Sequence, residues 1–471
     1  YQDFRTASCT PRDAEHHHAA RSLPKTLVGR LYGSLLLQLG INFGGSLGKK
    51  MGKRSSQLKN RTGLIAALDV GTTKASCFIA RMNAEGKPEI VGVGHRISKG
   101  LQCGTIIDMG NAEDTIRATV EAAEQMAGEN IREVFVNLSG GQPKSRLIAY
   151  EISIGGHEIG EADMRRVLDP ASLFKELPKD HELVHAIPVG FSVDGNRGVR
   201  DPKGLFGQRL GVNMHMVSAP AGSTRNLEMS VARCHLGLNG KIISPYASAL
   251  ACLSDDEKQL GVTYMDMGGG TTSIAVFFDN ELVHTDSIPL GGIHVTNDIA
   301  RGLSTPMNQA ERIKTMFGSA LPSSSDDQEI IEVPVIGEEE GGEMSQVPLS
   351  MVIGIIRPRL EEIFEMTRER LAASGFATVA GRHVVLSGGA SQLPGLREFA
   401  ASALDKQVRL ARPKSLQGLP EAVSGPAFAT CLGLLNYAEN NPADVLKGGR
   451  RLSEEPNGRL GRIGQWMREN F

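Results

Sequence analysis

Short apolar runs alternate with amphipathic stretches through most of this chain, a pattern typical of an α/β protein. Apolar runs bounded by glycine, proline or polar residues predict strands at 64–68, 75–80, 89–93 and 133–136. Between the last two runs, residues 111–127 predict a helix. The sequence therefore predicts a first α/β unit that begins near residue 63.

The alternation changes after this unit. Residues 141–219 contain an apolar run at 147–154, a predicted helix at 161–173, and predicted strands near 183–193 and 212–218. A predicted helix at 223–234 then leads into a second α/β half.

Residues 300–369 form a satellite of that second half. We expect Ser323-Ser-Ser-Asp-Asp327 to be an acidic hairpin tip, with a further acidic stretch at 338–343. The simplest interpretation of these charges is a solvated loop.

Two short motifs repeat each other about two hundred residues apart. They are Leu68-Asp-Val-Gly-Thr-Thr-Lys74 and Met265-Asp-Met-Gly-Gly-Gly-Thr-Thr-Ser273. In each, an aspartate ends an apolar run, glycine and threonine follow, and a second apolar run begins. This pattern predicts a β-hairpin, and it occurs twice.

Each predicted turn suits a phosphate. Glycine lets backbone N–H groups approach an anion, and threonine hydroxyls add donors. The residues concerned are Gly71, Thr72, Thr73, Gly268, Gly269, Gly270, Thr271 and Thr272. Asp69 and Asp266 would hold the water shell of Mg²⁺, which binds through one or two carboxylates plus phosphate oxygens, and Lys74 would add a positive charge. Either motif alone could be an ordinary glycine-rich hairpin, but the pair favours two turns facing a nucleoside triphosphate.

A third glycine motif supports the pair. Residues 384–387 predict a buried strand that ends at Gly388 and Gly389, followed by Ala390 and Gln392 before a helix. A base and ribose can lie against bare backbone at such a turn. The chain has no G-x-x-x-x-G-K-[ST], and no G-x-G-x-x-G follows a strand, which argues against a P-loop and a dinucleotide fold.

In this order, the three motifs resemble the phosphate and adenosine motifs of the actin, Hsp70 and sugar-kinase superfamily. Segments 244–250 and 425–433 resemble its two connecting helices. Within the superfamily, the chain resembles the FtsA family of bacterial cell-division proteins over roughly 63–471. The segments that carry this closer resemblance are Val91-Gly-Val-Gly94, Ser98-Lys-Gly-Leu101, Val136-Asn-Leu-Ser-Gly140, 288–300 and 310–314.

The resemblance implies an actin-like (ribonuclease H-like) two-domain ATPase fold, with duplicated βαβ cores and an FtsA-type inserted subdomain. The implied parts are a disordered basic extension (1–62), subdomain 1A (63–140 and about 220–245, with 425–437 packed on it), the inserted subdomain 1C (141–219), 2A (246–299 and 370–437), 2B (300–369), a flexible linker (438–458) and an amphipathic helix (459–471).

The resemblance also implies ATP and Mg²⁺ as ligands, places Glu311 and Lys314 at the ribose and adenine edge, and includes Gly292 among the cofactor-binding residues. For Glu311 and Lys314 the alternative is a surface ion pair at i, i+3. Hsp70-like relatives carry a glutamate before the proline of the first connecting helix, where this chain has Ser244, and Ser248 is the other small polar residue there. Neither hydroxyl acts as a base without help, so we expect no catalytic residue and at most slow ATP hydrolysis.

Composition narrows the class of partner. Residues 1–61 carry a net charge of +8, so the remainder carries −10 of the total −2. A folded part this acidic argues against nucleic-acid binding. The six cysteines, at 9, 77, 103, 234, 252 and 431, show no metal-site or disulfide spacing and suit a reducing cytosol.

The two ends of the chain differ in character. Residues 27–43 are too short and interrupted for a membrane span, and we expect the working protein to begin near Met51. At the other end, an apolar stripe follows a polar linker rich in glycine and proline. The stripe has helical spacing and consists of Leu460, Ile463, Met467 and Phe471, with Trp466 beside it and Arg462 and Arg468 off it.

A helix of twelve residues covers only ~18 Å, short of the ~30 Å hydrocarbon core, so it would lie in the membrane interface. The alternative is a terminal helix docked on its own core.

The favoured function is an ATP-binding cell-division protein that polymerises at the cytoplasmic face of the cell membrane, at the division septum. The FtsA resemblance implies that it anchors filaments of the tubulin-like protein FtsZ through 300–369 and recruits later division proteins through 141–219. Anionic lipid would bind the tail, and self-association would strengthen that binding by avidity. An actin-fold small-molecule kinase, a chaperone and a pilus-assembly relative are the alternatives.

Overall fold

The computed structural model describes residues 63–83, 85–169, 171–337, 344–440 and 444–445. The predictions for residues 1–62, for the acidic stretch 338–343, for most of the linker and for the tail lie outside the described residues.

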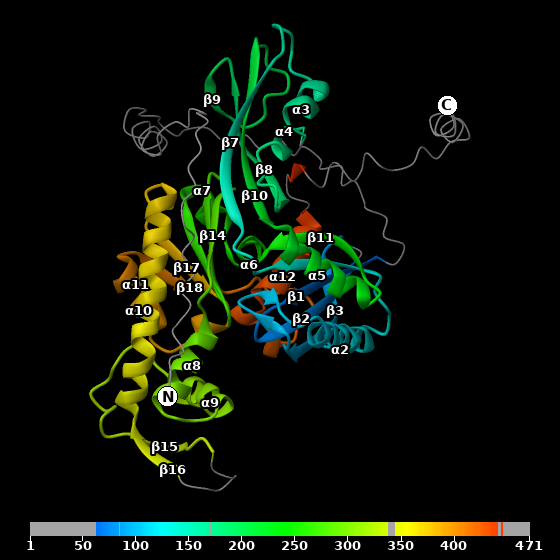
Figure 1. The fold of residues 1–471 in the computed structure, drawn as a ribbon. Helices are drawn as coiled ribbons and strands as arrows, with labels where there is room; N and C mark the ends of the chain where they lie inside the picture. Colours follow the sequence, from blue (N-terminus) through cyan, green and yellow to red (C-terminus); the bar gives the residue numbers. More distant parts are fainter. Residues whose placement is uncertain (1–62, 84, 170, 338–343, 441–443, 446–471) are drawn as a thin grey trace. The chain divides into compact units, whose positions relative to one another are not determined.

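Two five-stranded sheets share one topology and form the centres of two lobes (Figure 1). In the first lobe the order is β11-β6-β1-β2-β3, and in the second lobe it is β18-β17-β12-β13-β14. In both sheets an antiparallel hairpin is followed by parallel neighbours on one side. The predicted duplication is therefore present in the strand order.

The bounds of the first-lobe strands are β1 Leu64–Val70, β2 Lys74–Met82, β3 Pro88–Ile97, β6 Glu133–Leu138 and β11 Gly237–Ile243. Those of the second lobe are β12 Val262–Met267, β13 Thr272–Phe278, β14 Glu281–Ile288, β17 His383–Ser387 and β18 Gln407–Leu410. The small hairpin of β4 Leu101–Gln102 and β5 Thr105–Ile106 follows β3.

Helix α2 (Met109–Ala127) covers the first sheet and shows how local sequence sets its bounds. The Asp108 side chain accepts the N–H of Asn111 at its start, and left-handed Gly128 ends it. A Cβ on Gly94 of β3 would lie 2.1 Å from the Thr119 carbonyl oxygen. The Val91–Gly94 motif therefore lets α2 pack directly on the strand.

Two connecting helices join the lobes, α6 (Ser244–Cys252) and α12 (Ala429–Asn440). They approach so closely that a Cβ on Gly433 would lie 1.7 Å from the Ala247 carbonyl oxygen. Side chains from both lobes and both helices form one continuous apolar core, which includes Phe78, Tyr264 and Leu432.

The inserted subdomain has its own sheet, in the order β7-β10-β8-β9, and its own apolar core (Figure 1). Its elements are β7 Lys144–Ser153, α3 Glu161–Val167, α4 Ala171–Phe174, β8 His181–Val193, β9 Asn196–Val199 and β10 Arg209–Pro220. The prediction of one helix over 161–173 is wrong, because α3 and α4 are separate. Helix α5 (Ala221–Arg233) returns to the first lobe.

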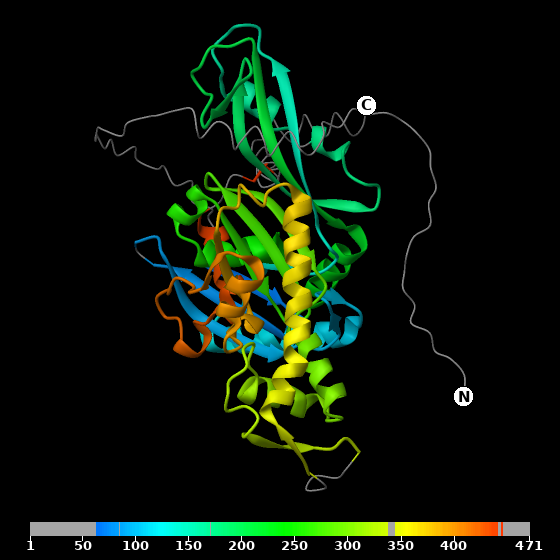
Figure 2. The same cartoon turned by 90° about the vertical axis from the view of Figure 1, so that its left-hand side faces the viewer.

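The satellite consists of helices and a two-stranded hairpin, and Figure 2 shows that hairpin at one end of the long helix α10. Its elements are α8 Gly292–Gly302, α9 Met307–Phe317, β15 Ile330–Pro334, β16 Met344–Pro348 and α10 Leu349–Ser374. Helices α8 and α10 run across the predicted limits at 299/300 and 369/370.

The acidic segment Ser323–Asp327 is not a hairpin tip, since it lies in turns before β15. Asp326 is buried there, and its carboxylate accepts the N–H of Ser323. The interpretation of this segment as a solvated loop is therefore wrong for Asp326.

The remaining elements complete the second lobe and its glycine turn. They are α7 Asp255–Leu260, η1 Gly389–Gln392, α11 Leu396–Leu404, η2 Glu421–Val423 and η3 Pro426–Phe428. None of the helices within the described ranges has the length and apolar character to span a membrane.

Candidate functional site

The two repeated motifs form equivalent turns. The N–H of Gly71 donates to the carbonyl of Lys74 over 3.0 Å between β1 and β2. The N–H of Gly268 donates to the carbonyl of Thr271 over 2.8 Å between β12 and β13. The same i to i+3 hydrogen bond thus closes both hairpins, as the duplicated sequence predicts.

The tips of the two turns touch each other across the lobes. A Cβ on Gly269 would lie 2.3 Å from Cγ2 of Thr73, and one on Gly270 would lie 2.4 Å from Oγ1 of Thr72. Glycine is therefore required at both positions for this approach. The turns meet over a cavity of about 150 Å³ that residues of both lobes line.

Most of the predicted phosphate residues line this cavity. They are Asp69, Gly71, Thr72, Thr73, Lys74, Asp266, Gly268, Gly269, Gly270, Thr271, Gly388 and Gly389. Thr272 does not line it, because its hydroxyl is turned to the carbonyl of Leu290 over 2.9 Å.

The two aspartates are both buried beside the cavity. The pKa of Asp69 is raised to about 7, mainly by burial; the Lys74 ammonium opposes the rise and the nearby Asp266 carboxyl adds to it. Burial also raises the pKa of Asp266, and hydrogen bonds from Ser248 and Thr430 oppose that rise. Two acids this costly to ionise together are suited to a nearby cation.

Lys74 lies within the same group of charges. Its Nζ is 3.2 Å from the centre of the Phe428 ring, which belongs to the turn before α12. Burial lowers the pKa of Lys74, and the Asp69 carboxylate opposes this change. Lys74 could leave the ring of Phe428 and contact a bound anion instead, and an anion would compensate its positive charge better than the ring does.

The third glycine turn approaches Asp266 from the second lobe. Gly388 has φ +86°, and a Cβ there would lie 2.3 Å from the Met267 carbonyl oxygen and 2.7 Å from Oδ1 of Asp266. Ala390 and Gln392 follow in η1. This turn therefore brings bare backbone against the second phosphate motif.

Lys314, Glu311 and Gly292 meet beside that turn. Nζ of Lys314 lies 2.7 Å from Oε2 of Glu311 and donates to the Gly292 carbonyl over 3.2 Å. A Cβ on Gly292 would touch that of Ala390 at 3.3 Å. The alternative ion pair at i, i+3 is thus formed, and it also joins α9 to α8 at the predicted nucleoside edge. These four residues and Gln392 do not line the 150 Å³ cavity.

Several lining residues were not assigned to the site from the sequence. They are Ser139, Ser273, Pro426, Ala427 and Thr430. Ser244 also lines the cavity, and the sequence identified it only as the residue that stands where Hsp70-like relatives carry a glutamate. All of them lie within segments that carry the resemblance to the superfamily or to the family, so that resemblance was the available signal.

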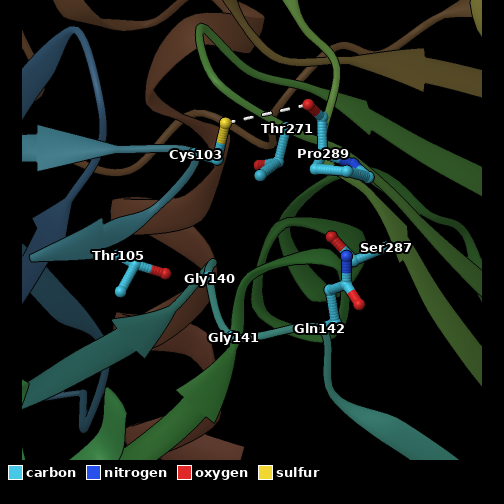
Figure 3. A pocket seen from close by; sticks show the side chains of 8 residues that line it. All are labelled: Cys103, Thr105, Gly140, Gly141, Gln142, Thr271, Ser287 and Pro289. Atoms are coloured by element: carbon cyan, nitrogen blue, oxygen red, sulfur yellow. Dashed lines mark hydrogen bonds between the residues drawn. The ribbon is translucent and has the colours of Figure 1, made fainter. Parts of the chain in front are cut away.

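A larger cavity of about 280 Å³ adjoins the first and shares Thr271 with it (Figure 3). Its lining has no charged side chain and includes Cys103, whose thiol lies 3.7 Å from the Pro289 carbonyl oxygen. Charged groups and glycine turns gather at the smaller cavity, so we assign the candidate phosphate site to that one.

A magnesium site at this cavity would have few protein ligands. The described part of the chain has no cluster of three or more His, Cys, Asp or Glu side chains that could hold a metal. Mg²⁺ requires only one or two carboxylates when phosphate oxygens and water complete its shell. Asp69 and Asp266, buried at a cavity with glycine turns, fit that requirement.

Comparisons with known proteins agree on one family. The family model described as "Cell division protein FtsA" matches residues 263–433, and the model described as "SHS2 domain inserted in FTSA" matches residues 140–218. The chain is 43% identical over 423 residues to cell division protein FtsA of Rhizobium meliloti (strain 1021), covering 87% of this chain and 96% of the relative. It is 30% identical over 419 residues to the Escherichia coli (strain K12) protein, covering 87% and 98%.

Among solved structures, the "PilM-PilN type IV pilus biogenesis complex" matches with a TM-score of 0.57 at 17% identity, over 80% of this chain and 99% of that one. This likeness concerns the fold alone. The predicted α/β actin-like fold with an FtsA-type inserted subdomain is confirmed.

Proposed function

Since this chain belongs to the FtsA family of cell-division proteins, we propose that it binds ATP with Mg²⁺ between its lobes and tethers FtsZ filaments to the membrane. The observation that carries the nucleotide proposal is the pair of touching glycine turns, with Asp69 and Asp266 buried at one cavity. The backbone N–H groups of both turns would bind the phosphates. Bound Mg²⁺ would neutralise charge on the triphosphate.

ATP in this proposal is a structural ligand that is hydrolysed slowly at most. The polar groups that α6 and the loop after β6 contribute to the cavity are the hydroxyls of Ser244 and Ser139. These two hydroxyls hydrogen-bond each other at 2.8 Å, and neither of them acts as a base at neutral pH without help. Efficient activation of water requires a positioned base, and in this proposal the two carboxylates at the cavity, Asp69 and Asp266, are engaged with the water shell of Mg²⁺ instead.

Membrane attachment is assigned to the C-terminal stripe of Leu460, Ile463, Trp466, Met467 and Phe471, with Arg462 and Arg468 facing anionic lipid. One short helix is a weak anchor, so polymerisation on the cytoplasmic face of the cell membrane would strengthen the attachment through avidity. The satellite 300–369 would bind FtsZ, and the inserted subdomain would recruit later division proteins at the septum.

The test is co-sedimentation with anionic and with neutral vesicles in the presence of Mg²⁺ and ATP. We expect the intact chain to pellet with anionic vesicles, and a chain truncated before Arg459 to remain in the supernatant. Trp466→Glu should act like the truncation, whereas Glu469→Gln, which lies off the stripe, should act like the intact chain. Equal sedimentation of all four chains would contradict the tether. FtsZ filaments added to the pelleting chain should then sediment with it.

A further inference from the structure

Asn137 lies directly behind the first phosphate turn. It is on β6, the parallel neighbour of β1, and it is buried with 2% of its surface exposed. Its Nδ2 donates to Oδ1 of Asp69 over 2.6 Å, and its Oδ1 accepts the N–H of Val70 over 2.7 Å. One amide thus holds both the Asp69 carboxylate and the backbone at the end of β1, the strand that carries Asp69.

The chemistry of its neighbours determines how this amide is oriented. The backbone N–H of Val70 can only donate, so it must face the amide oxygen. A carboxylate at Asp69 can only accept, so it must face the amide nitrogen. The asparagine amide supplies this acceptor and this donor from two separate atoms held in one plane.

Asn137 also reaches the connecting helix. Its Nδ2 lies 2.8 Å from Oγ of Ser139 and 3.1 Å from Oγ of Ser244, the first residue of α6. Both serines line the 150 Å³ cavity together with Asp69. The amide therefore joins the carboxylate to the other polar groups on the first-lobe side of the cavity.

The two aspartates are held differently. Oδ2 of Asp266 accepts from hydroxyls on the two connecting helices, Ser248 at 3.0 Å and Thr430 at 3.5 Å. A hydroxyl hydrogen rotates about its C–O bond, whereas the amide at Asn137 presents its donor in one plane. Oδ1 of Asp69 is occupied by this amide, and within the described residues no hydrogen-bond donor contacts its Oδ2.

We propose that Asn137 is a positioning residue for the magnesium site. Its amide holds Asp69 by Oδ1, so that Oδ2 remains available to the water shell of the ion. This inference rests on the proposed binding of ATP with Mg²⁺. Hydrogen bonds to the groups that hold a metal orient them, and loss of such a bond typically lowers metal affinity by about 10- to 100-fold.

The experiment measures the dissociation constant for ATP once with MgCl₂ and once with EDTA. The ratio of the EDTA value to the MgCl₂ value is the gain in ATP affinity that Mg²⁺ provides. Asn137→Ala removes the hydrogen bonds to Asp69 and Val70 together with those to the two serines. Asn137→Asp keeps the acceptor for the Val70 N–H and replaces the donor to Asp69 with a carboxylate oxygen. We expect both variants to lower this ratio, the gain in ATP affinity from Mg²⁺, about tenfold or more. Their affinity in EDTA should stay within about twofold of that of the unaltered chain, since no metal is bound there.

Asn436→Ala is the matched control, because it removes a different, half-buried amide whose Nδ2 donates to the Leu250 carbonyl at 3.4 Å. It should leave the ratio unchanged. A ratio that either Asn137 variant leaves unchanged or raises would overturn the positioning role. An equal loss of affinity in MgCl₂ and in EDTA would also overturn it, since that is what a merely structural residue would produce. Failure of the unaltered chain to bind ATP would instead overturn the proposed function, and the inference with it.

Discussion

At the scale of single residues, the candidate site concentrates charge where water is scarce. Asp69 and Asp266 are 8% and 9% exposed, and their charges repel each other. Lys74 offsets part of this repulsion while it lies against Phe428. Without a ligand, the folded chain therefore carries a carboxyl that is costly to ionise, and binding of a cation would remove that cost.

Asp69 should make the ligand-free protein less stable as pH rises. Its pKa is about 7 in the folded chain against an ordinary 3.8, so from about pH 4 to 7 the unfolded chain releases this proton first. The contribution to the free energy of unfolding is full below that window and lost above it, by at most about 4 kcal/mol. Urea unfolding at pH 5 and pH 8, without Mg²⁺ and nucleotide, measures the part of the loss that falls above pH 5, at most about 2.7 kcal/mol.

The Asp69→Asn variant isolates this residue from others that titrate in the same window. Glu281 is one of them, since burial raises its pKa to about 7 as well. We expect the variant to lose less stability than the unaltered chain between pH 5 and pH 8. Identical losses in the two chains would show that Asp69 does not carry the effect.

At the scale of elements, helix α12 links the candidate site to the inserted subdomain. Thr430 near its start bonds Asp266, and Tyr437 near its end donates to Oδ2 of Asp444 over 3.2 Å. Asp444 also accepts from Nδ1 of His185 on β8 at 2.7 Å and from the N–H of Ala186 at 3.2 Å. The start of the C-terminal segment is thereby held against the inserted sheet.

A chain that ends at Asn440 should lose this junction, whereas a chain that ends at Val445 should keep it. The shorter chain leaves buried donors on His185 and Ala186 without Asp444, which costs about 2–4 kcal/mol. Urea unfolding compares the two truncations with the full chain. The chain ending at Val445 is the matched control, because both truncated chains lack residues 446–471. Equal stability of the two truncated chains would show that Asp444 contributes nothing.

Local patterns predicted most elements and the two phosphate turns, because alternating apolar runs and glycine turns are written in neighbouring residues. The split between α3 and α4 was missed although Pro170 disfavours a continuous helix there. Asn137 could not be assigned a role in this way, since its contact with Asp69 joins residues 68 positions apart. Thr430 and Asp266 are separated by 164 positions, so their pairing likewise depends on how the lobes pack.

At the scale of the whole molecule, the apolar cores define which parts respond together. One core runs through both lobes and both connecting helices, whereas the sheet of the inserted subdomain has a core of its own. Segments that share a core tend to open together. Nucleotide binding between the lobes should therefore stabilise, as a unit, the core that both lobes share, although the segments of this core come from opposite halves of the sequence.

Hydrogen exchange with and without Mg²⁺ and ATP tests this behaviour. A ligand at about 100 times its dissociation constant stabilises the state that binds it by about 2.7 kcal/mol, which slows exchange through global opening about 100-fold. We expect slower exchange in β1–β2, in β12–β13 and in α12, because these elements contribute to one cavity and one core. The strands β7 and β9 should change less, because their core is separate. Protection confined to one lobe would mean that the nucleotide contacts one turn only, and it would contradict a site shared by Asp69 and Asp266.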